Sequence, residues 1–440
     1  MLVMKFGGTS LGDRERIETV VRLVRGRLAR KPVLVCSAHA KVTDLLLEGA
    51  RAAAQGKPDV GPIAAREHEV LTSLKLPTSL VDDDLRRLSE IFQGLSLLRE
   101  LTPRSLDHVA AFGERMCVKA IAALLRRRKV PATAVQADEA GLVTDARYTR
   151  AQPLPEAYEH LARSLRTVKG VPVVTGFIGR DRDGNVTTLG RSGSDYTATI
   201  VGRAVGAEEV EIWKDVDGVL TADPRIVPHA RPVERMTYAE ASELAYYGAK
   251  VIHPSTIHPA LEAGIPVRIL NTFDPSAPGT VIEPTRASGS APVTSIASKR
   301  GIRLVNIVSG RMLGQSGFMA GVFEAFRRHD VVIDLIATSE VSVTVSVDRP
   351  DGLEAAVADL RAIAQVDVEG PCALVAVVGD GIGGGGNVVG SVFTALAASG
   401  VAVRAISYGA TKTNLQVVIA EADANRTVAA LHAAVFERDR

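Results

Sequence analysis

The chain has 440 residues, of which 46% are hydrophobic and 23% are charged, and its formal net charge is +2. This length exceeds one ordinary domain, so two or three domains with sizeable cores are expected and wholesale disorder is excluded. The near-neutral charge and an aromatic content of only 4% argue against nucleic-acid binding as the main activity.

The three cysteines, Cys36, Cys117 and Cys372, are scattered and form no paired spacing. This usage is typical of a reducing compartment and offers neither a disulfide frame nor a metal knuckle. His253 and His258 fall at a spacing that does not put two ligands on one helical face, so we assign no structural metal. Cys36 lies in the apolar run VLVCS, which favours a core position over a role as nucleophile. With no evident leader peptide or membrane span, we expect a soluble, cytoplasmic protein.

Strand and helix patterns alternate at the start of the chain. LVMKF predicts a strand, Asp13 is placed to cap a helix over residues 14–29, and VLVCS predicts the next strand. This βαβ order predicts a parallel sheet. Helical periodicity then extends over about residues 43–128, which we interpret as a helical subregion set over the sheet.

Strand patterns return at VPVVTGFIG, EEVEIW and IPVRIL, separated by helical stretches around SDYTATIVGRAVG and TYAEASELAYYG. The segment EPTRASGSAPVTSIAS is rich in Pro, Ser, Gly and Thr, as linkers are. We therefore predict a first domain over residues 1–284 and a linker over residues 285–297.

An internal repeat follows this linker: GFMAGVFEAFRRHDVVIDLIATSEVSVTVSV matches NVVGSVFTALAASGVAVRAISYGATKTNLQVVI. Three apolar pairs define the match: Phe323 with Phe393, Val331 with Val401, and Ile336 with Ile406. Each copy predicts an amphipathic helix and two strands, and a strand pattern, LVNIVS or ALVAVVG, precedes each copy. We predict two small α+β modules, at residues 298–368 and 369–440, that pair to bury their exposed faces.

Two glycine-containing stretches have the composition of anion-binding turns. KFGGTS places Lys5 at a strand end before Gly7 and Gly8, where converging N–H groups and a lysine can hold an anion. The alternative is an ordinary glycine turn with a solvated lysine. In GFIGRDRDGNVTTLGRSGSDYTA, DRDGN predicts a hairpin turn. A helix then begins near Ser194, just after Arg191, and this helix N-terminus suits a bound carboxylate or phosphate. The alternative is that Ser194 and Asp195 merely cap the helix, which does not explain why Arg191 lies beside two glycines.

Charged residues follow another predicted strand in EIWKDVDGVLTADPR. Lys214 and Asp215 stand where α/β folds bind ligands, beyond the carboxyl end of a strand, and Arg225 could reach a phosphate. The alternative is an ordinary acidic loop. Lys250 could supply a second cation, although a lone lysine is usually solvated.

Two further segments fit a small charged substrate. SAHAKVTDLL offers the hydroxyl groups of Ser37 and Thr43 as donors. FGERMC, in a helical stretch, offers Glu114 and Arg115. Glu114 could hold an ammonium group, but a surface salt pair on a helix is the default interpretation.

In this order, KFGGTS, GFIG, TTLGRSGSDYTA, KDVDGVLTADPR and YGAKVIHP resemble the aspartate kinase branch of the amino acid kinase family. The resemblance extends over nearly the whole chain, because the repeat looks like the paired ACT modules at the C-terminus of these enzymes. It implies an α/β amino acid kinase fold, with a mainly parallel sheet sandwiched by helices, followed by two ferredoxin-like α+β ACT domains.

The resemblance implies ATP-dependent phosphorylation of the β-carboxylate of L-aspartate to 4-phospho-L-aspartate, the first step towards lysine, threonine and methionine. The nucleophile is a carboxylate that is already ionised at neutral pH, so no general base is needed. Catalysis then reduces to positioning and charge neutralisation, with Mg²⁺ carried on the ATP phosphates. The alternatives are a related kinase for glutamate, carbamate or a nucleoside monophosphate, and a non-catalytic amino-acid sensor.

Site residues follow from the same resemblance. The implied catalytic positions are Lys5, Gly7, Gly8 and Asp195. The implied aspartate-binding positions are Ser37, Thr43, Glu114, Arg191 and Ser194, with Arg191 on the α-carboxylate and Glu114 on the amine. The implied ATP-binding positions are Lys214, Asp215, Arg225 and Lys250. Leu220 stands where many relatives carry tyrosine, and Lys214 replaces the threonine of some members, so details of ATP binding stay open.

MLGQSGFMAGVF and VIDLIATSEVS resemble the effector module of lysine-sensitive aspartate kinases. The implied effector positions are Met312, Gln315, Phe318, Met319, Asp334, Ser339 and Glu340. Asp334 and Glu340 could pair with a cationic amino acid, so lysine is the expected effector, followed by threonine, with S-adenosylmethionine as a co-effector to consider. The alternative is that the modules serve only to dimerise, and a homodimer or larger assembly is expected through them.

Overall fold

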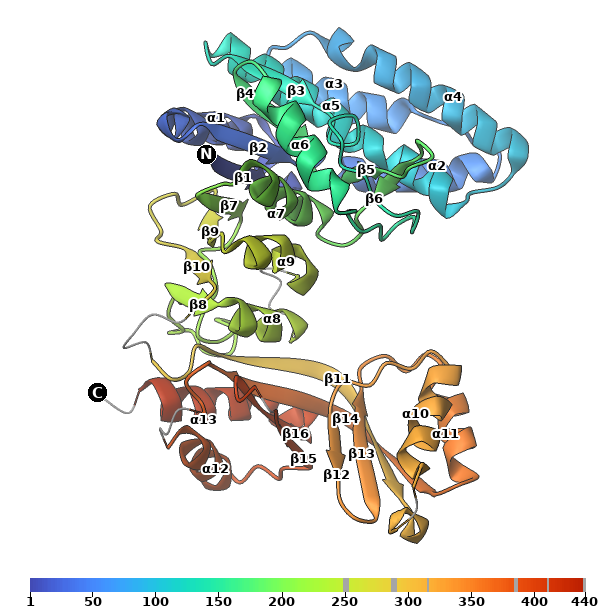
Figure 1. Cartoon of the computed structure of the whole chain (residues 1–440), viewed down its shortest axis with the longest axis vertical. Helices are drawn as coiled ribbons and strands as arrows, with labels where there is room; N and C mark the ends of the chain where they lie inside the picture. The colour runs from blue at the N-terminus through green and yellow to red at the C-terminus, as the bar shows by residue number, and fades with distance from the viewer. Residues whose placement is uncertain (248–252, 286–290, 315, 384–386, 410, 438–440) are drawn as a thin grey trace. The chain divides into compact units, whose positions relative to one another are not determined.

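The computed structural model describes residues 1–247, 253–285, 291–314, 316–383, 387–409 and 411–437. The chain forms two compact units, each described here by itself (Figure 1). The first comprises Met1–Val219, Glu234–Tyr238 and Val251–Thr285, and the second comprises Leu220–Val233, Ala239–Lys250 and Arg286–Arg440. Within the described residues, no helix has both the length and the apolar character needed to cross a membrane.

The first unit is built on an eight-stranded sheet in the order β3-β4-β2-β1-β7-β9-β10-β8. The six strands from β3 to β9 in this order are mutually parallel, and only β10 runs antiparallel to its neighbour β9. The strands are β1 (Leu2–Phe6), β2 (Pro32–Cys36), β3 (Ala132–Val135), β4 (Val171–Thr175), β7 (Glu209–Lys214), β8 (Arg235–Thr237), β9 (Val267–Asn271) and β10 (Thr280–Glu283). The predicted parallel α/β fold is confirmed.

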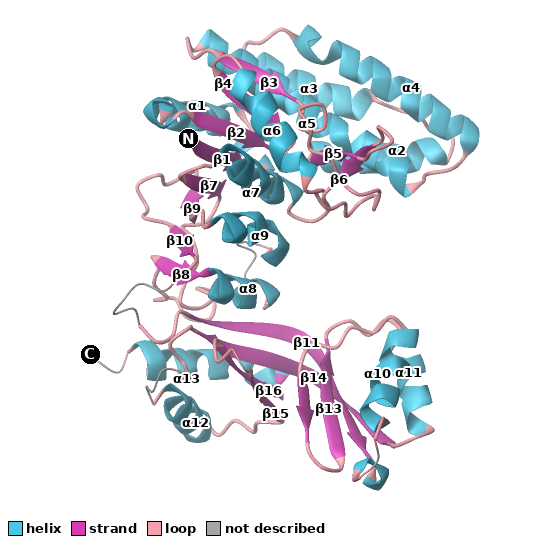
Figure 2. Cartoon of the chain, viewed as in Figure 1, coloured by secondary structure: helices cyan, strands magenta, loops and turns pink. Residues whose placement is uncertain are grey.

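Helices cover this sheet (Figure 2). They are α1 (Arg14–Gly26), α2 (Val42–Ala54), α3 (Gly61–Ser73), α4 (Asp82–Leu98), α5 (Pro103–Arg127), α6 (Glu156–Thr167), α7 (Gly193–Val205) and α9 (Pro254–Ala263). Helices α2 to α5 form the helical subregion that the periodicity predicts. Helix α8 (Tyr238–Tyr246) starts with a residue of the first unit and continues in the second.

Local sequence accounts for the first βαβ unit. Every residue of β1 is buried, because an apolar strand in the middle of a parallel sheet is covered on both faces. The Asp13 carboxylate accepts a hydrogen bond of 3.0 Å from the Arg16 N–H and caps α1, as predicted. Cys36 ends β2 fully buried, and this burial raises the pKa of its thiol to about 12, which confirms a core position.

The DRDGN segment forms the predicted hairpin between β5 (Ile178–Arg180) and β6 (Val186–Thr188), which pair antiparallel. The Asp181 carboxylate accepts hydrogen bonds from the N–H groups of Asp183 (3.0 Å) and Asn185 (2.8 Å). A short polar side chain that binds its own turn in this way stabilises it locally.

The second unit contains a six-stranded antiparallel sheet in the order β12-β13-β11-β14-β16-β15. Its strands are β11 (Ser295–Val308), β12 (Ile336–Thr338), β13 (Ser342–Val347), β14 (Gln365–Val378), β15 (Ala405–Tyr408) and β16 (Asn414–Ala420). Its further helices are α10 (Phe318–Arg328), α11 (Leu353–Arg361), α12 (Val388–Ala398) and α13 (Ala424–Phe436). The predicted α+β modules are confirmed, and each repeat copy is followed by one helix more, α11 or α13, than its pattern predicted.

The two modules share their longest strands. The start of β11 pairs with the end of β14, and the end of β11 pairs with the start of β14, across an irregularity near Ile302. β11 begins at Ser295, inside the segment whose composition predicted a linker up to residue 297, and residues 286–290 lie outside the described residues. One continuous sheet therefore joins both modules.

Candidate active site

The sheet brings three predicted site segments to one edge. β1 pairs in parallel with β2 on one side and β7 on the other, so the carboxyl ends of all three strands lie together. Lys5 is the penultimate residue of β1, Ser37 follows β2, and Lys214 ends β7. Ligands bind at this edge in parallel α/β sheets.

A buried carboxylate joins two of these strands through their lysines. Asp195 lies in the first turn of α7; its Oδ1 is 2.5 Å from Lys5 Nζ and its Oδ2 is 3.1 Å from Lys214 Nζ. The Asp195 side chain is only 4% exposed. Burial by itself raises the pKa of Asp195, but the charges and hydrogen bonds of the two lysines outweigh it and hold the pKa below its ordinary value. The group is therefore an anion at neutral pH.

A cavity of about 230 Å³ opens beside this ion-pair cluster. It is lined by Lys5, Ser37, Thr43, Glu114, Phe177, Gly190, Ser192, Gly193, Ser194 and Asp195. Six of these ten residues are predicted site residues, although those six come from four separate segments of the chain. The N-terminus of α7 meets the cavity at Gly193, so the positive end of the helix dipole is available to an anion.

The cavity has two acidic residues, Asp195 and Glu114, and only Asp195 forms ion pairs with lysines. Glu114 sits on α5 and is 3% exposed, so the default interpretation as a surface salt pair is wrong; its neighbour Arg115 pairs instead with Asp138 at 2.9 Å. Burial raises the pKa of Glu114 to about 8, and a hydrogen bond from the Ala38 backbone opposes this only in part. Glu114 Oε2 has no hydrogen-bond partner among the described residues, which suits a cationic ligand group.

Both glycines of the first turn pack closely against neighbouring groups. A Cβ added to Gly8 would lie 3.2 Å from the Ala38 carbonyl oxygen, and one added to Gly7 would lie 3.3 Å from Lys5 Nζ. A Cβ at Gly8 would press on the backbone of the segment after β2, and a Cβ at Gly7 would crowd the Lys5 ammonium group. The glycine pair therefore keeps the backbone next to Lys5, as an anion-binding turn requires.

The other predicted residues lie outside the cavity lining. Arg191 is exposed in the turn before α7, and Asp215 is exposed in the turn after β7. Arg225 belongs to the second unit, where it is exposed and paired with Asp223 at 2.6 Å. Lys250 lies outside the described residues.

Phe177 and Ser192 line the cavity, but no role was predicted for either. Phe177 has a φ of +67°, unusual for an aromatic residue, and its N–H donates to Thr197 Oγ1 at 2.9 Å. Ser192, with a φ of +56°, is the N-cap position of α7. Phe177 lies in the GFIG motif and Ser192 lies in the GRSGSD stretch, so the sequence marked both segments as part of the site. Which residues of these segments line the cavity depends on how the two turns pack.

The predicted effector positions gather on the module that contains α10. Met312, Phe318 and Met319 are partly buried against its core, while Ser339 and Glu340 are exposed between β12 and β13. Gln315 lies outside the described residues.

Asp334 is half-buried, and it hydrogen-bonds the Tyr246 hydroxyl at the end of α8. Burial raises the pKa of Asp334, although Tyr246 and Lys299 act in the opposite direction.

Lys5 and the N-terminus of α7 line a small cavity at the carboxyl edge of a parallel sheet, and Lys214 is joined to them through Asp195. This arrangement has the chemistry of a phosphotransferase site for a small charged molecule. Residues 1–271 match the sequence profile of the amino acid kinase family, and residues 305–361 and 375–435 match that of the ACT domain. The chain therefore belongs to the amino acid kinase family, in its aspartate kinase branch with C-terminal ACT domains.

Relatives along the full length agree. Aspartokinase 3 of Arabidopsis thaliana chloroplasts is 39% identical over 99% of this chain and 82% of its own length. Lysine-sensitive aspartokinase 3 of Escherichia coli is 34% identical over 99% of both chains. The structure of E. coli aspartokinase III with lysine and aspartate (T-state) matches with a TM-score of 0.82 and 31% identity over 99% of both chains. Its complex with aspartate and ADP (R-state) matches with a TM-score of 0.82 and 32% identity.

Proposed function

We propose that this enzyme transfers the γ-phosphoryl group of ATP to the β-carboxylate of L-aspartate and forms 4-phospho-L-aspartate. The observation that carries the proposal is the Lys5–Asp195–Lys214 cluster beside a cavity that also holds Glu114. The similar E. coli enzyme binds aspartate and ADP. The product would feed synthesis of lysine, threonine and methionine.

Aspartate carries one ammonium and two carboxylate groups, and the cavity offers a partner for each kind. Glu114, with its free Oε2, would hold the ammonium group. The hydroxyls of Ser37, Thr43 and Ser194 would donate to the carboxylates, together with the N–H groups that begin α7. Arg191, which is exposed in the turn before α7, would bind the α-carboxylate of the substrate.

The chemistry needs no proton abstraction, because a β-carboxylate is ionised at neutral pH. Lys5, with the backbone at Gly7 and Gly8, would neutralise charge on the phosphoryl group as it transfers. Asp195 holds this lysine in place.

Both Asp195 oxygens are engaged by lysines, so the cavity residues do not form a cage for Mg²⁺. The metal fits the site as part of the nucleotide complex, where it offsets phosphate charge.

A separate set of residues is proposed to bind the nucleotide. The candidate residues are Lys214, Asp215, Arg225 and Lys250, and among those described only Lys214 belongs to the ion-pair cluster. Leu220 stands where many relatives carry tyrosine near the nucleotide, so any stacking or hydroxyl contact of that tyrosine would be lost here.

We further propose feedback regulation through the ACT modules, with lysine as first candidate effector, threonine next and S-adenosylmethionine as co-effector. The E. coli enzyme that this chain resembles binds lysine. Asp334 and Glu340 would bind the cationic side chain. Because Asp334 already hydrogen-bonds Tyr246 of α8, an effector there would change the restraint on that helix. A homodimer or larger assembly through these modules is part of the same proposal.

The test is a hydroxylamine-trapping assay for the acyl phosphate, with aspartate, ATP and Mg²⁺. We expect aspartyl hydroxamate from the unmodified enzyme and from Lys169→Ala, which removes an exposed lysine, and almost none from Lys5→Ala. Glutamate and nucleoside monophosphates should be poor substrates. Hydroxamate formation that is unaffected by Lys5→Ala, or a preference for another acceptor, would reject the proposal.

A further inference from the structure

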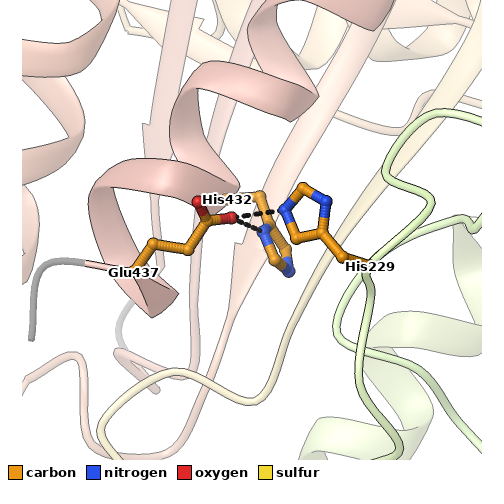
Figure 3. Close-up of side chains that lie close together, drawn as sticks. All are labelled: His229, His432 and Glu437. Atoms are coloured by element: carbon orange, nitrogen blue, oxygen red, sulfur yellow. Dashed lines mark hydrogen bonds and ion pairs between the residues drawn. The ribbon is translucent and has the colours of Figure 1, made fainter. Parts of the chain in front are cut away.

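Three side chains outside the active site converge in the second unit (Figure 3). His229 lies in the loop Leu220–Val233, His432 lies on α13, and Glu437 directly follows that helix. Glu437 Oε1 is 2.6 Å from His229 Nε2 and 3.0 Å from His432 Nδ1. The three candidate donor atoms all lie within 4.8 Å of one another. The proposed phosphoryl transfer assigns no role to these three residues.

Two imidazole nitrogens and one carboxylate oxygen are a donor set that Zn²⁺ and other late first-row metals prefer. Mg²⁺ prefers oxygen ligands in an octahedral arrangement, so this cluster is chemically distinct from the nucleotide's metal. Tetrahedral zinc, with bonds of about 2.0–2.1 Å, places its donors about 3.3 Å apart. The two contacts to Glu437 would need to open by less than about 1 Å, and the two histidine nitrogens, at most 4.8 Å apart, would need to close by at most about 1.5 Å. Rotation of the exposed His229 side chain can supply both movements.

The surroundings already hold the buried ligand in a usable orientation. His432 is 1% exposed, and its Nε2 lies 3.0 Å from Thr221 Oγ1. Thr221 Oγ1 also accepts the Arg231 N–H at 3.0 Å. With one lone pair left, this hydroxyl can accept a hydrogen bond from the His432 Nε2–H group, in the tautomer whose Nδ1 lone pair faces Glu437. Metal-bound histidines commonly have such a partner on the other nitrogen.

Hydrogen bonding and ring packing also restrain the segments that carry the cluster. Arg231 Nη2 donates to the Phe436 carbonyl oxygen at 2.7 Å, so the loop that carries His229 is tied to the end of α13 beside Glu437. The His432 ring packs against Phe436, with ring centroids 4.8 Å apart. Two of the three ligands are thus restrained before any ion binds, which lowers the entropic cost of forming the site.

We propose that His229, His432 and Glu437 bind one zinc-type transition-metal ion through Nε2, Nδ1 and the carboxylate. Because the His229 side chain is 65% exposed, at least one further coordination position opens to solvent. The bound ion cross-links the loop Leu220–Val233 to α13. It therefore stabilises the second unit, since a ligand that binds the folded state selectively raises its stability.

The test uses the untagged full-length chain, stripped with a chelator and free of nucleotide. Titration with ZnCl₂ is followed by calorimetry, and titration with CoCl₂ is followed by visible absorption, which reports tetrahedral coordination. We expect one equivalent of metal, and a loss of affinity of about 100-fold in His229→Ala and in Glu437→Gln. Zinc should raise the Tm of the unmodified chain and leave that of His229→Ala unchanged.

His258→Ala is the matched control. His258 is also 65% exposed and has a carboxylate near it, Glu262, at 3.5 Å, but within the described part of the chain no second histidine completes a three-ligand group there. Its removal should leave metal affinity unchanged. A cluster held only by hydrogen bonds would show equal, weak zinc binding in all four proteins, and that result would overturn the proposal. Since binding is measured without substrates, the outcome is independent of the proposed aspartate kinase activity.

Discussion

Asp195 holds Lys5 through one carboxylate oxygen and Lys214 through the other, at 2.5 Å and 3.1 Å, in a nearly solvent-free position. The carboxylate belongs to a helix, and the two lysines belong to neighbouring strands of the sheet. Two ammonium groups are thereby fixed at the edge of the cavity, and together they carry one more positive charge than the carboxylate neutralises. This excess charge is available for a transferring phosphoryl group.

Replacing the central carboxylate should damage folding and catalysis together. Asp195→Asn would leave the buried Lys5 and the partly buried Lys214 without their counter-ion, which we expect to lower the free energy of unfolding by about 3–5 kcal/mol. We expect kcat to fall by about 10³-fold, because Lys5 loses its position. Urea unfolding and steady-state kinetics measure the two effects.

A second variant separates charge balance from shape in this cluster. Adding Lys214→Met to Asp195→Asn removes one of the unpaired charges, so part of the lost stability should return. Activity should not return with it. Additive losses of stability in the double variant would contradict the coupling that the ion pairs imply.

Glu114 should impose a pH dependence on substrate binding. Its pKa of about 8 in the free enzyme means that it is mostly neutral at pH 7, whereas an ammonium group binds the carboxylate form. We therefore expect KM for aspartate to fall as pH rises from 6.5 to 8.5. Glu114→Gln should raise KM at every pH and abolish this slope. A slope that persists in Glu114→Gln would assign the titration to another group.

The same pKa has a consequence for stability. The folded chain keeps the Glu114 proton up to about pH 8, whereas an unfolded glutamate loses it near pH 4.5. The folded state therefore binds more protons in this window, and the free energy of unfolding should fall as pH rises from about 5 to 8. Unfolding curves of the unliganded enzyme should show this trend, and those of Glu114→Gln should show a weaker one.

Close packing between two turns predicts a position-specific effect of alanine. A Cβ at Gly176 would lie 2.5 Å from Ser194 Oγ, so Gly176→Ala must displace the start of α7. We expect kcat/KM to fall at least about 10-fold, as small misplacements in a site do. Gly94→Ala is the control: this helical glycine has nothing within 4 Å of its Cβ position, and alanine there should stabilise by about 0.5–1 kcal/mol without changing kinetics.

Effector sensitivity should depend on Asp334. Asp334→Asn would remove the charge that pairs with a lysine side chain, so the lysine concentration for half-inhibition should rise at least about 10-fold. Activity without lysine should stay close to that of the unmodified enzyme. Asp351→Asn, at an exposed position of the same module, should change neither quantity. Equal inhibition of both variants would place the effector elsewhere.

Local patterns were sufficient for much of this molecule. The strand LVMKF, the Asp13 cap, the DRDGN hairpin and the β-α-β-β repeat were predicted from sequence, because each is determined by hydrophobic period or turn chemistry within a few residues. The ordered motifs also identified the family. Six of the ten cavity-lining residues were predicted, since glycine turns and strand ends mark the ligand edge of such sheets.

Other features depended on packing between distant segments. In the sequence, Glu114 has the pattern of an ordinary residue on a helix surface. Only the tertiary structure shows that it is buried beside the cavity, and this burial raises its pKa. The bridge from Asp195 to Lys214 and the meeting of His229 with His432 likewise join residues that no local pattern connects. A sequence specifies which side chains exist and which face of an element they occupy. Which of them share a low-dielectric site, with the electrostatics that follow, is decided only when the elements pack.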